Sequence, residues 1–457
     1  MEVASGSTWP TLPAVPSPAT LPVVASGLAA ELAYAFGGPF HFLLPDAFTA
    51  NLVAMQDALT KAGVDGFVYY AKKANKAAVF AERSAAGGAG VDVASAAELR
   101  EALGHGVRGE HLMVTGPAKS PVLLRLALAH RATIAVDALD ELDQVISLAL
   151  TGGARPARVL LRALPATQQH SRFGMSESEL TTALKRCVEA RDAIRMEGFS
   201  FHLSGYALQP RANLAARLID LCADARSHGL EAGRISIGGG LPISYTDAES
   251  WHTFLATQSP AHYHGGKSFR TTDFYPYHSP LAGADALTAL LATQPVNTHS
   301  PLANRLKDAG IELLLEPGRA LLDQAGATVF TIQGVKDRDG YQIVTVDGTS
   351  LSLSEQWFNS EYLPDPQLIP RDPAATTGLY PASVGAASCL ESDMLTWRKV
   401  AFPQPPQVGD LLLYPNTAGY QMDSNESPFH DLPLPPKVVV DRTDRIRPRW
   451  RLDRHFT

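Results

Sequence analysis

The chain has 457 residues, about three times the length of an average domain, which excludes a single small domain. A hydrophobic fraction of 45% and a charged fraction of 19% are ordinary for a globular protein and exclude a disordered chain. The formal net charge of −7 disfavours a general nucleic-acid-binding surface, and no apolar run approaches the ~20 residues of a membrane span.

The N-terminal segment is predicted to be a flexible leader. Residues 1–30 are rich in proline, alanine and serine, and they lack both the basic start and the compact apolar core of a secretory signal. Residues 31–45 contain the apolar run Phe40–Leu44, which is predicted to form a strand that joins a β domain. Apolar residues at helical spacing then predict a helix over Ala47–Ala62 that stops at Gly63.

Residues 46–325 alternate between short apolar segments and amphipathic helical patterns. Strands are expected at Gly66–Ala71, Val91–Ala94, His111–Thr115, Thr133–Val136, Arg158–Ala163, Phe199–Leu203, Arg234–Ile237 and Glu312–Leu315. Helices are expected at Ser95–Leu103, Ser120–His130, Ala138–Leu150, Glu177–Arg195 and Ala212–His228. Apolar strands that alternate with helices favour a parallel sheet, and eight such units predict an α/β fold of the (β/α)8 TIM-barrel kind. From the pattern alone, a doubly wound open sheet is the alternative.

The alternation is interrupted once and then ends. His262–Pro280 is aromatic and polar, and is predicted to be a loop inserted near the barrel mouth. Residues 326–457 are predicted to form a mostly β C-terminal domain, because Ala327–Val335 and Tyr341–Val346 alternate and flank the hairpin signal Asp337–Gly340. Further short strands are expected at Val384–Ala387, Asp410–Tyr414, Lys437–Val440 and Trp450–Leu452.

Functional side chains of such a barrel are expected at the C-terminal ends of the strands. The first predicted strand ends in Tyr70-Ala71-Lys72-Lys73-Ala74-Asn75. A lysine at this place can form a Schiff base with a carbonyl compound, although two solvated lysines are the simpler interpretation of this segment alone. The sixth strand ends in Phe201-His202-Leu203-Ser204-Gly205, where His202 can lie flat on a planar ring or be a hydrogen-bonded core imidazole.

The last two predicted strands end in glycines and in a pair of opposite charges. Ile237-Gly238-Gly239-Gly240 offers backbone N–H groups to a phosphate, although such runs also occur in plain turns. Glu316-Pro317-Gly318-Arg319 can bind a heterocycle nitrogen and a phosphate, or form an internal salt bridge. Separate structural explanations for all four strand ends are less economical than one cofactor. A lysine, a stacking histidine, a glycine loop and this pair are together what pyridoxal 5′-phosphate needs.

These motifs resemble those of the ornithine, diaminopimelate and arginine decarboxylase superfamily, which are pyridoxal-phosphate enzymes of fold type III, the alanine-racemase fold. The resemblance covers roughly residues 40–440, with the motifs in the expected order. It implies that Lys73 is the Schiff-base lysine and that Lys73, Cys389 and His202 are the catalytic residues. The further cofactor contacts that it implies are Asp92, His202, Ser204, Gly238, Gly239, Gly240, Glu316, Gly318, Arg319 and Tyr420. Cys389, with Asp393, resembles the catalytic cysteine segment of the β domain.

The chain departs from the pattern of this superfamily at positions that contact ligands. The usual Phe-His-x-Gly-Ser is here Phe201-His202-Leu203-Ser204-Gly205. Family members that hold a distal ammonium have an acid directly after the catalytic cysteine, where this chain has Leu390 and then Glu391. Residues 350–358 contain no arginine for a second carboxylate, and Glu355 lies near that place. Diaminopimelate is therefore disfavoured as the substrate. The candidate substrate contacts are Glu355, Leu390, Glu391 and Asp393.

The resemblance implies an amino-acid decarboxylase that acts on an amino acid or a derivative of one. The substrate amine displaces Lys73 from the cofactor, carbon dioxide leaves from Cα, and Cys389 of the partner subunit is the candidate acid that reprotonates Cα. Glu316 favours this reaction over racemisation, because a carboxylate keeps the pyridine nitrogen protonated, whereas alanine racemases place an arginine there. A racemase or epimerase on the same fold is the alternative, and a non-catalytic pyridoxal-phosphate-binding protein is a third hypothesis.

The resemblance also implies a homodimer with shared active sites, and no nucleic-acid or membrane partner is expected. The three cysteines, Cys187, Cys222 and Cys389, are widely spaced. This spacing excludes a disulfide framework and a cysteine-based zinc site, so no metal is predicted. The expected location is a reducing cytoplasm.

Overall fold

The computed structural model describes residues 9–152, 155–353, 361–373, 378–423, 425–441 and 448–453. The chain divides into two compact units. The first, here called the barrel unit, comprises Thr49–Pro242 and Leu281–Leu321. The second, the β unit, comprises Met1–Phe48, Ile243–Pro280 and Leu322–Thr457.

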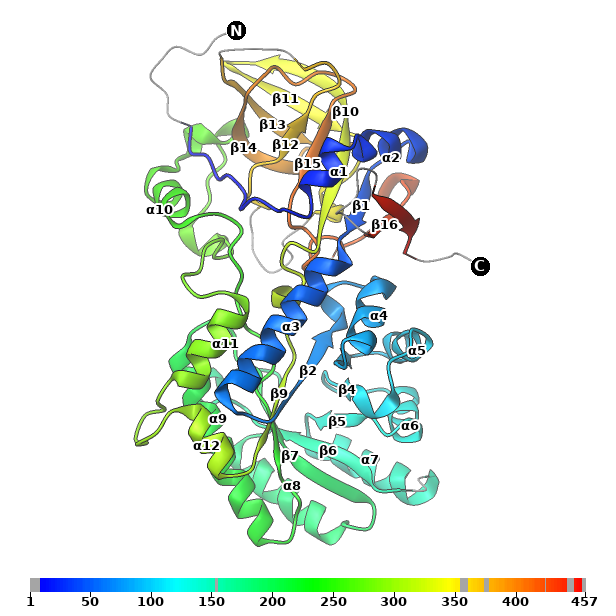
Figure 1. Ribbon diagram of the computed structural model, residues 1–457, viewed down its shortest axis with the longest axis vertical. Helices are drawn as coiled ribbons and strands as arrows, with labels where there is room; N and C mark the ends of the chain where they lie inside the picture. Colours follow the sequence, from blue (N-terminus) through cyan, green and yellow to red (C-terminus); the bar gives the residue numbers. More distant parts are fainter. Residues whose placement is uncertain are drawn as a thin grey trace. The chain divides into compact units, whose positions relative to one another are not determined.

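The barrel unit contains a closed barrel of eight parallel strands, in the order β2 to β9 (Figure 1). The strands are β2 (Gly66–Ala71), β3 (Gly90–Val93), β4 (Leu112–Val114), β5 (Thr133–Val136), β6 (Ala157–Arg162), β7 (Ile194–Ser200), β8 (Arg234–Ser236) and β9 (Glu312–Leu315). Strand β9 closes the barrel by pairing with β2, where Leu315 lies opposite Val68. The predicted (β/α)8 barrel is therefore confirmed, and the open sheet is excluded.

Helices surround the strands of this barrel (Figure 1). They are α3 (Pro45–Ala62), α4 (Ala78–Ala86), α5 (Ala96–Gly104), α6 (Pro121–Ala129), α7 (Leu139–Gly152), α8 (Glu177–Glu189), α9 (Leu208–Ser227), α11 (Gly283–Ala292) and α12 (Leu302–Asp308). Serine N-caps start three of them, because the side chains of Ser95, Ser120 and Ser176 accept backbone N–H groups of the first turn. The helix predicted to reach Arg195 ends at Glu189 instead, since Ile194 already begins β7.

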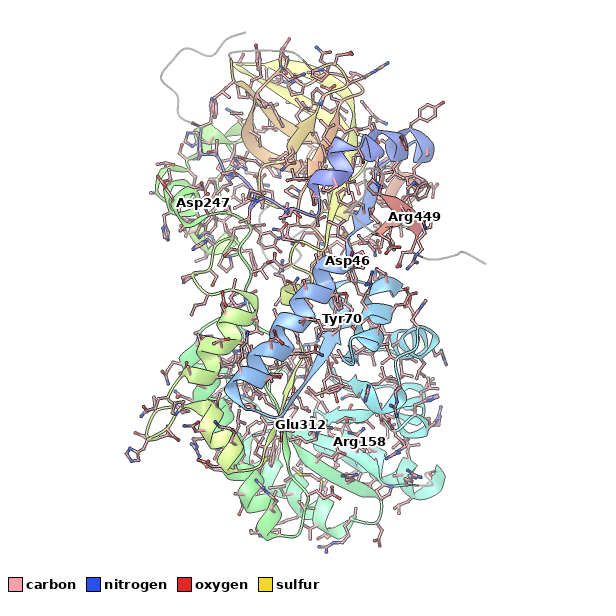
Figure 2. The ribbon with its side chains drawn as sticks, viewed as in Figure 1. Asp46, Tyr70, Arg158, Asp247, Glu312 and Arg449 are labelled. Atoms are coloured by element: carbon pink, nitrogen blue, oxygen red, sulfur yellow. The ribbon has the colours of Figure 1, made fainter. Side chains whose placement is uncertain are left out.

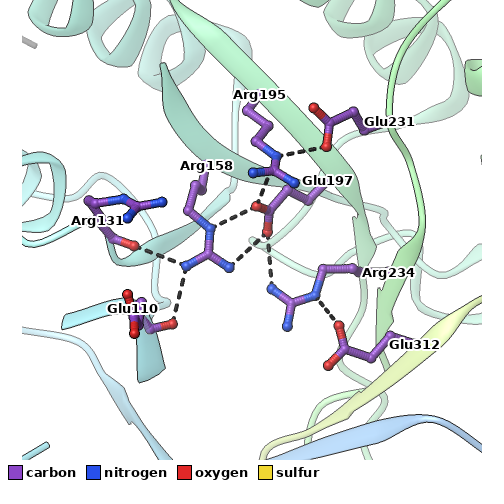
Figure 3. Close-up of polar contacts among 8 residues, drawn as sticks. All are labelled: Glu110, Arg131, Arg158, Arg195, Glu197, Glu231, Arg234 and Glu312. Atoms are coloured by element: carbon purple, nitrogen blue, oxygen red, sulfur yellow. Dashed lines mark hydrogen bonds and ion pairs between the residues drawn. The ribbon is translucent and has the colours of Figure 1, made fainter. Parts of the chain in front are cut away.

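The two ends of the barrel carry different chemistry. In Figure 2, Tyr70 marks the C-terminal end of β2, while Arg158 and Glu312 mark the N-terminal ends of β6 and β9. At that N-terminal end, the buried Glu197 carboxylate accepts hydrogen bonds from Arg158, at 2.7 and 3.1 Å, and from Arg234, at 3.0 Å (Figure 3). Arg234 also donates to Glu312, at 2.6 Å. The cluster therefore ties β6, β7, β8 and β9 together at one end.

The β unit is built on a nine-stranded sheet. Its strands are β1 (Phe40–Leu43), β10 (Gly326–Arg338), β11 (Tyr341–Val346), β12 (Gln367–Ile369), β13 (Tyr380–Gly385), β14 (Met394–Phe402), β15 (Leu411–Tyr414), β16 (Lys437–Asp441) and β17 (Arg449–Leu452). The predicted N-terminal strand, β1, pairs antiparallel with β10 and parallel with β16. Strands β10 and β11 form the predicted hairpin, which turns through Gly340 at a φ of 81°. The mostly β second domain is thus confirmed.

The structure corrects the flexible leader predicted for residues 1–30. Residues 1–8 lie outside the described part, but α1 (Leu21–Ala25) and α2 (Leu28–Phe36) are regular helices. Leu28 and Leu32, four residues apart, share one face of α2 and belong to the same buried core as Phe40 and Phe42 of β1. Two leucines at helical spacing are sufficient to bury one face of a short helix. They change the average composition of residues 1–30 very little, so the composition did not predict this helix.

The predicted insertion His262–Pro280 is also corrected. It forms part of the longer segment Ile243–Pro280, which includes α10 (Ala248–Thr257) and belongs to the β unit rather than to the barrel. The buried rings of Tyr245 and Tyr277 pack edge-on against Tyr362, with centroids 5.6 and 5.9 Å apart. Buried aromatic rings of this size dominate the energetics of a small core, so they fix the segment to the β unit.

Among the described residues, no helix combines the length and the apolar character needed to cross a membrane.

Candidate active site

The two adjacent lysines after β2 have different environments. Both lie in the short 3₁₀ turn Lys72–Ala74. Lys72 is buried, and its Nζ donates to the carbonyl of Lys76 at 2.9 Å and pairs with Glu101 at 3.3 Å. The Lys73 side chain is 48% exposed, and its Nζ lies 3.0 Å from Asp92. The structure thus separates a structural lysine from one whose amine is accessible to a carbonyl ligand.

Asp92 holds the Lys73 amine from the end of β3. Its carboxylate is buried and also accepts a hydrogen bond of 2.6 Å from the Thr115 hydroxyl, which follows β4. A carboxylate with two donors from neighbouring strands has a fixed orientation. The Lys73 amine is therefore directed by a buried charge, and not only by its own flexible side chain.

Glu316 follows β9 and is half-buried. Its Oε1 accepts a hydrogen bond of 2.5 Å from the Ser236 hydroxyl, which in turn accepts the N–H of Gly238 at 3.2 Å. Removal from bulk water, and then the neighbouring Asp92 carboxylate, raise the pKa of Glu316 to about 7. A cation beside Glu316 would reverse this shift, and a protonated pyridine nitrogen is such a cation.

The loop Gly238-Gly239-Gly240 is packed so closely that side chains do not fit. Gly238 and Gly240 have φ values of 66° and 79°. A Cβ atom on Gly238 would lie 2.8 Å from His202 Nδ1, and one on Gly239 would lie 2.8 Å from the carbonyl oxygen of Glu316. Glycine is therefore required here, and it brings bare backbone next to both His202 and Glu316.

His202 lies between β7 and this glycine loop. Although the side chain is exposed, the surrounding protein and then the positive charge of Lys73 lower the pKa of His202 well below its usual range. The ring is consequently neutral at pH 7, which suits contact with a planar ligand. Ser204, in the same segment, is exposed.

Sequence reasoning missed Arg211, which is buried in the first part of α9. Its guanidinium donates to the carbonyl of Ile237 at 3.0 Å and to that of Gly205 at 3.1 Å. A Cβ atom on Gly240 would collide with this group, at 2.2 Å. Arg211 therefore joins the loop after β7 to the glycine loop after β8. The available signal was a charged residue on a helix face that otherwise carries alanine and leucine.

Arg162 was also missed, although it occupies the last position of β6. It pairs with Asp137 at 2.9 Å, and its guanidinium carbon lies 4.6 Å from the centre of the Phe173 ring. A positive charge at the end of an otherwise apolar strand was the signal. Arg319, in the 3₁₀ turn Arg319–Leu321, and the adjoining Gly318 complete the candidate residues of the barrel unit.

The remaining candidates belong to the β unit. Cys389 is exposed, and its Sγ lies 3.2 Å from Nε2 of His430. Tyr420 has a left-handed backbone with a φ of 78°, a conformation that costs energy for a residue other than glycine.

Three of the four candidate substrate contacts can be located. Asp393 is buried and accepts the backbone N–H of Ser350 at 2.9 Å, so it fixes a loop. Leu390 and Glu391 are exposed. Glu355 lies outside the described residues.

Comparisons with known proteins agree with this chemistry. Residues 47–269 match the family described as the pyridoxal binding domain of pyridoxal-dependent decarboxylases. Protein y4yA of Sinorhizobium fredii is 40% identical over 416 residues, which is 90% of each chain. A diaminopimelate decarboxylase of Actinosynnema pretiosum is 26% identical over 425 residues, or 90% of this chain and 86% of that one.

A solved structure shares the fold. Diaminopimelate decarboxylase from Helicobacter pylori, crystallised in complex with L-lysine, superposes with a TM-score of 0.70 at 17% identity. The match covers 91% of this chain and 93% of that one.

The donor set of the barrel unit fits pyridoxal phosphate. The accessible amine suits the aldehyde, the carboxylate whose pKa is raised by burial suits the ring nitrogen, and the loop with no room for side chains suits the phosphate. These groups would be Lys73, Glu316 and Gly238-Gly239-Gly240, with Arg319 beside the phosphate.

Proposed function

Because the chain belongs to the fold type III pyridoxal-phosphate-dependent decarboxylases, and is a carboxy-lyase with that cofactor, we propose that it decarboxylates an amino acid whose distal end carries no ammonium group. The observation that carries the choice of reaction is Glu316. A carboxylate whose pKa is raised to about 7 by burial is well matched to a protonated ring nitrogen. The arginine that alanine racemases place there would oppose that proton, so Glu316 argues against racemisation.

The bound cofactor supplies an electron sink for the pair of electrons that the departing carboxylate leaves behind. Lys73 would hold the aldehyde of the cofactor, and its amine would give way to the amine of the substrate. The contact of 3.0 Å between Lys73 Nζ and Asp92 supports a role for Asp92 in holding the Lys73 ammonium while the substrate occupies the cofactor. Glu316 holds the proton on the ring nitrogen, and its own orientation is held by Ser236.

The distal specificity is argued from the residue after Cys389. Leu390 is 52% exposed and apolar, so it offers no charge to a distal ammonium. In the proposed site between subunits, an ammonium buried against Leu390 without a partner would cost several kcal/mol. A substrate whose distal end is uncharged, acylated or anionic avoids this cost.

We expect free ornithine, lysine and diaminopimelate to be poor substrates, and neutral or acylated analogues of similar length to be better ones. The measurement is carbon dioxide release from a panel of amino acids, with the stereochemistry of recovered substrate followed in parallel. If ornithine or lysine reaches a kcat/KM of about 10⁴ M⁻¹s⁻¹, an ordinary enzyme value, the argument from Leu390 is wrong. Stereoinversion without carbon dioxide release would instead support a racemase.

Leu390→Glu tests the same position in the opposite direction. The new carboxylate should raise kcat/KM for ornithine or lysine by about tenfold or more, whereas Leu390→Gln, which has nearly the same shape without the charge, should not. Equal effects of the two variants would mean that charge at this position does not select the substrate.

The proposed enzyme is a homodimer in which Cys389 acts on the site of the other subunit. If so, mixing inactive Lys73→Ala and inactive Cys389→Ala proteins should restore activity, because a hybrid dimer contains one site with both residues intact. Up to about one quarter of wild-type activity is expected from random exchange of equal amounts. Subunit exchange without any recovery of activity would place both residues in one chain.

A further inference from the structure

Cys389 and His430 form an exposed thiol–imidazole pair within the β unit. Cys389 lies in the segment that precedes β14, and His430 lies in the short 3₁₀ turn Phe429–Asp431. The Sγ and Nε2 atoms are 3.2 Å apart, well within hydrogen-bonding range for sulfur. His430 has a φ of 61°, which costs backbone energy for a residue other than glycine. Contact between the two side chains thus coincides with a strained backbone.

The ring of His430 is held from a second side. Phe429 lies edge-on to the imidazole, with ring centres 4.4 Å apart. This contact leaves the Nε2 atom directed at Cys389, as the 3.2 Å distance shows. The imidazole therefore contacts Cys389 through Nε2 and Phe429 through its ring.

Charged groups near the pair act elsewhere. Asp393 accepts the backbone N–H of Ser350. Burial lowers the pKa of His264, which lies in the turn His264–Gly266, and the negative charge of Glu391 opposes that shift. Asp431 directly follows His430 in the chain. Neither Asp393 nor Glu391 takes the place of His430 as the hydrogen-bond partner of the thiol.

The other two cysteines are chemically different. Cys187 and Cys222 are buried, and burial raises the pKa of each thiol to about 12. Buried thiols of this kind are inert towards alkylating reagents at neutral pH. A thiol reagent applied to the native protein consequently reports on Cys389.

We propose that His430 is a positioning residue that holds the Cys389 thiol and returns its proton after each turnover. This inference rests on the role of Cys389 in the proposed function. First, the S–H bond of Cys389 breaks as a C–H bond forms at Cα of the substrate. His430 then takes a proton from a buffer acid and, as the imidazolium, passes a proton to the thiolate, so the thiol and the neutral imidazole are both restored. No electrons are gained or lost, and the pair returns to its starting state.

An experiment on the holoenzyme tests the pair without any substrate. The rate of alkylation of Cys389 by iodoacetamide at pH 7 is followed by mass spectrometry. His430→Gln should slow it by about fivefold or more, because the amide cannot take the thiol proton as the sulfur attacks the reagent. The exposed His252 on α10 provides a matched control, and His252→Gln should leave the rate unchanged. An unreactive Cys389 in the wild type, or an unchanged rate in His430→Gln, overturns the proposal.

Turnover tests the return of the proton. His430→Ala should lower kcat by roughly 10- to 100-fold with little change in KM, and added imidazole should restore part of the loss. Slowed alkylation together with an unchanged kcat would refute the relay. If Cys389→Ala retains full kcat, the acid role in the proposed function fails, whereas the alkylation result still decides whether the pair exists.

Discussion

Lys73→Ala should abolish the covalent attachment of pyridoxal phosphate and lower kcat by about 10³-fold or more. The amine of Lys73 is accessible and directed by the buried Asp92, so we propose it as the group that binds the cofactor aldehyde. Borohydride reduction followed by peptide mass spectrometry should find the cofactor on Lys73 in the wild type. No reduced adduct should be found elsewhere in the variant.

The neighbouring lysine is a matched control for this experiment. Lys72 is buried, paired with Glu101 and bound to the carbonyl of Lys76, so Lys72→Ala should keep the reducible imine on Lys73. Its cost should appear in thermal stability, since the variant leaves a carbonyl without its donor. A reducible imine at full occupancy in Lys73→Ala, or its loss in Lys72→Ala alone, would contradict the assignment.

Glu316→Gln should retain the cofactor and lower kcat by about 10² to 10³-fold. The amide has nearly the same shape as the carboxylate but cannot balance the charge of a protonated ring nitrogen, so the ring becomes a weaker electron sink. Cofactor occupancy, measured after release by alkali, should remain close to that of the wild type. Turnover is measured as carbon dioxide release.

A second glutamate on the same strand serves as the control. Glu312 begins β9 at the opposite end of the barrel, where it pairs with Arg234. Glu312→Gln should leave kcat nearly unchanged and lower the thermal stability slightly, because a partly exposed ion pair contributes about 1 kcal/mol or less. Equal losses of turnover in the two variants would mean that Glu316 acts through the stability of β9.

The barrel and its strand-end residues could be predicted because both are local properties of the chain. Apolar strands followed by helices define the eight units, and Lys73, His202 and Glu316 each lie within two residues of the end of one of those strands. In a parallel barrel, the ends of all the strands meet at one edge, so residues far apart in sequence are brought together without further information.

The features that were missed depend on contacts between distant segments. Arg211 matters because its guanidinium reaches the carbonyls of two loops, which no local pattern reveals. The segment Ile243–Pro280 belongs to the β unit because its tyrosines pack on Tyr362. Tyr362 follows Tyr277 by more than 80 residues in the sequence, so no local pattern reveals this contact. The short helix α2 was hidden by composition, since the burial of Leu28 and Leu32 requires a partner sheet.

The arginine–glutamate cluster around Glu197 has a consequence for how this enzyme can evolve. Its ion pairs connect four strands at one end of the barrel. The other end carries Lys73, His202, the glycine loop and Glu316. Substitutions in the loops at that other end therefore leave these ion pairs intact. Related proteins can therefore change substrate through substitutions at one end of the barrel, while the ion pairs at the opposite end keep the barrel closed.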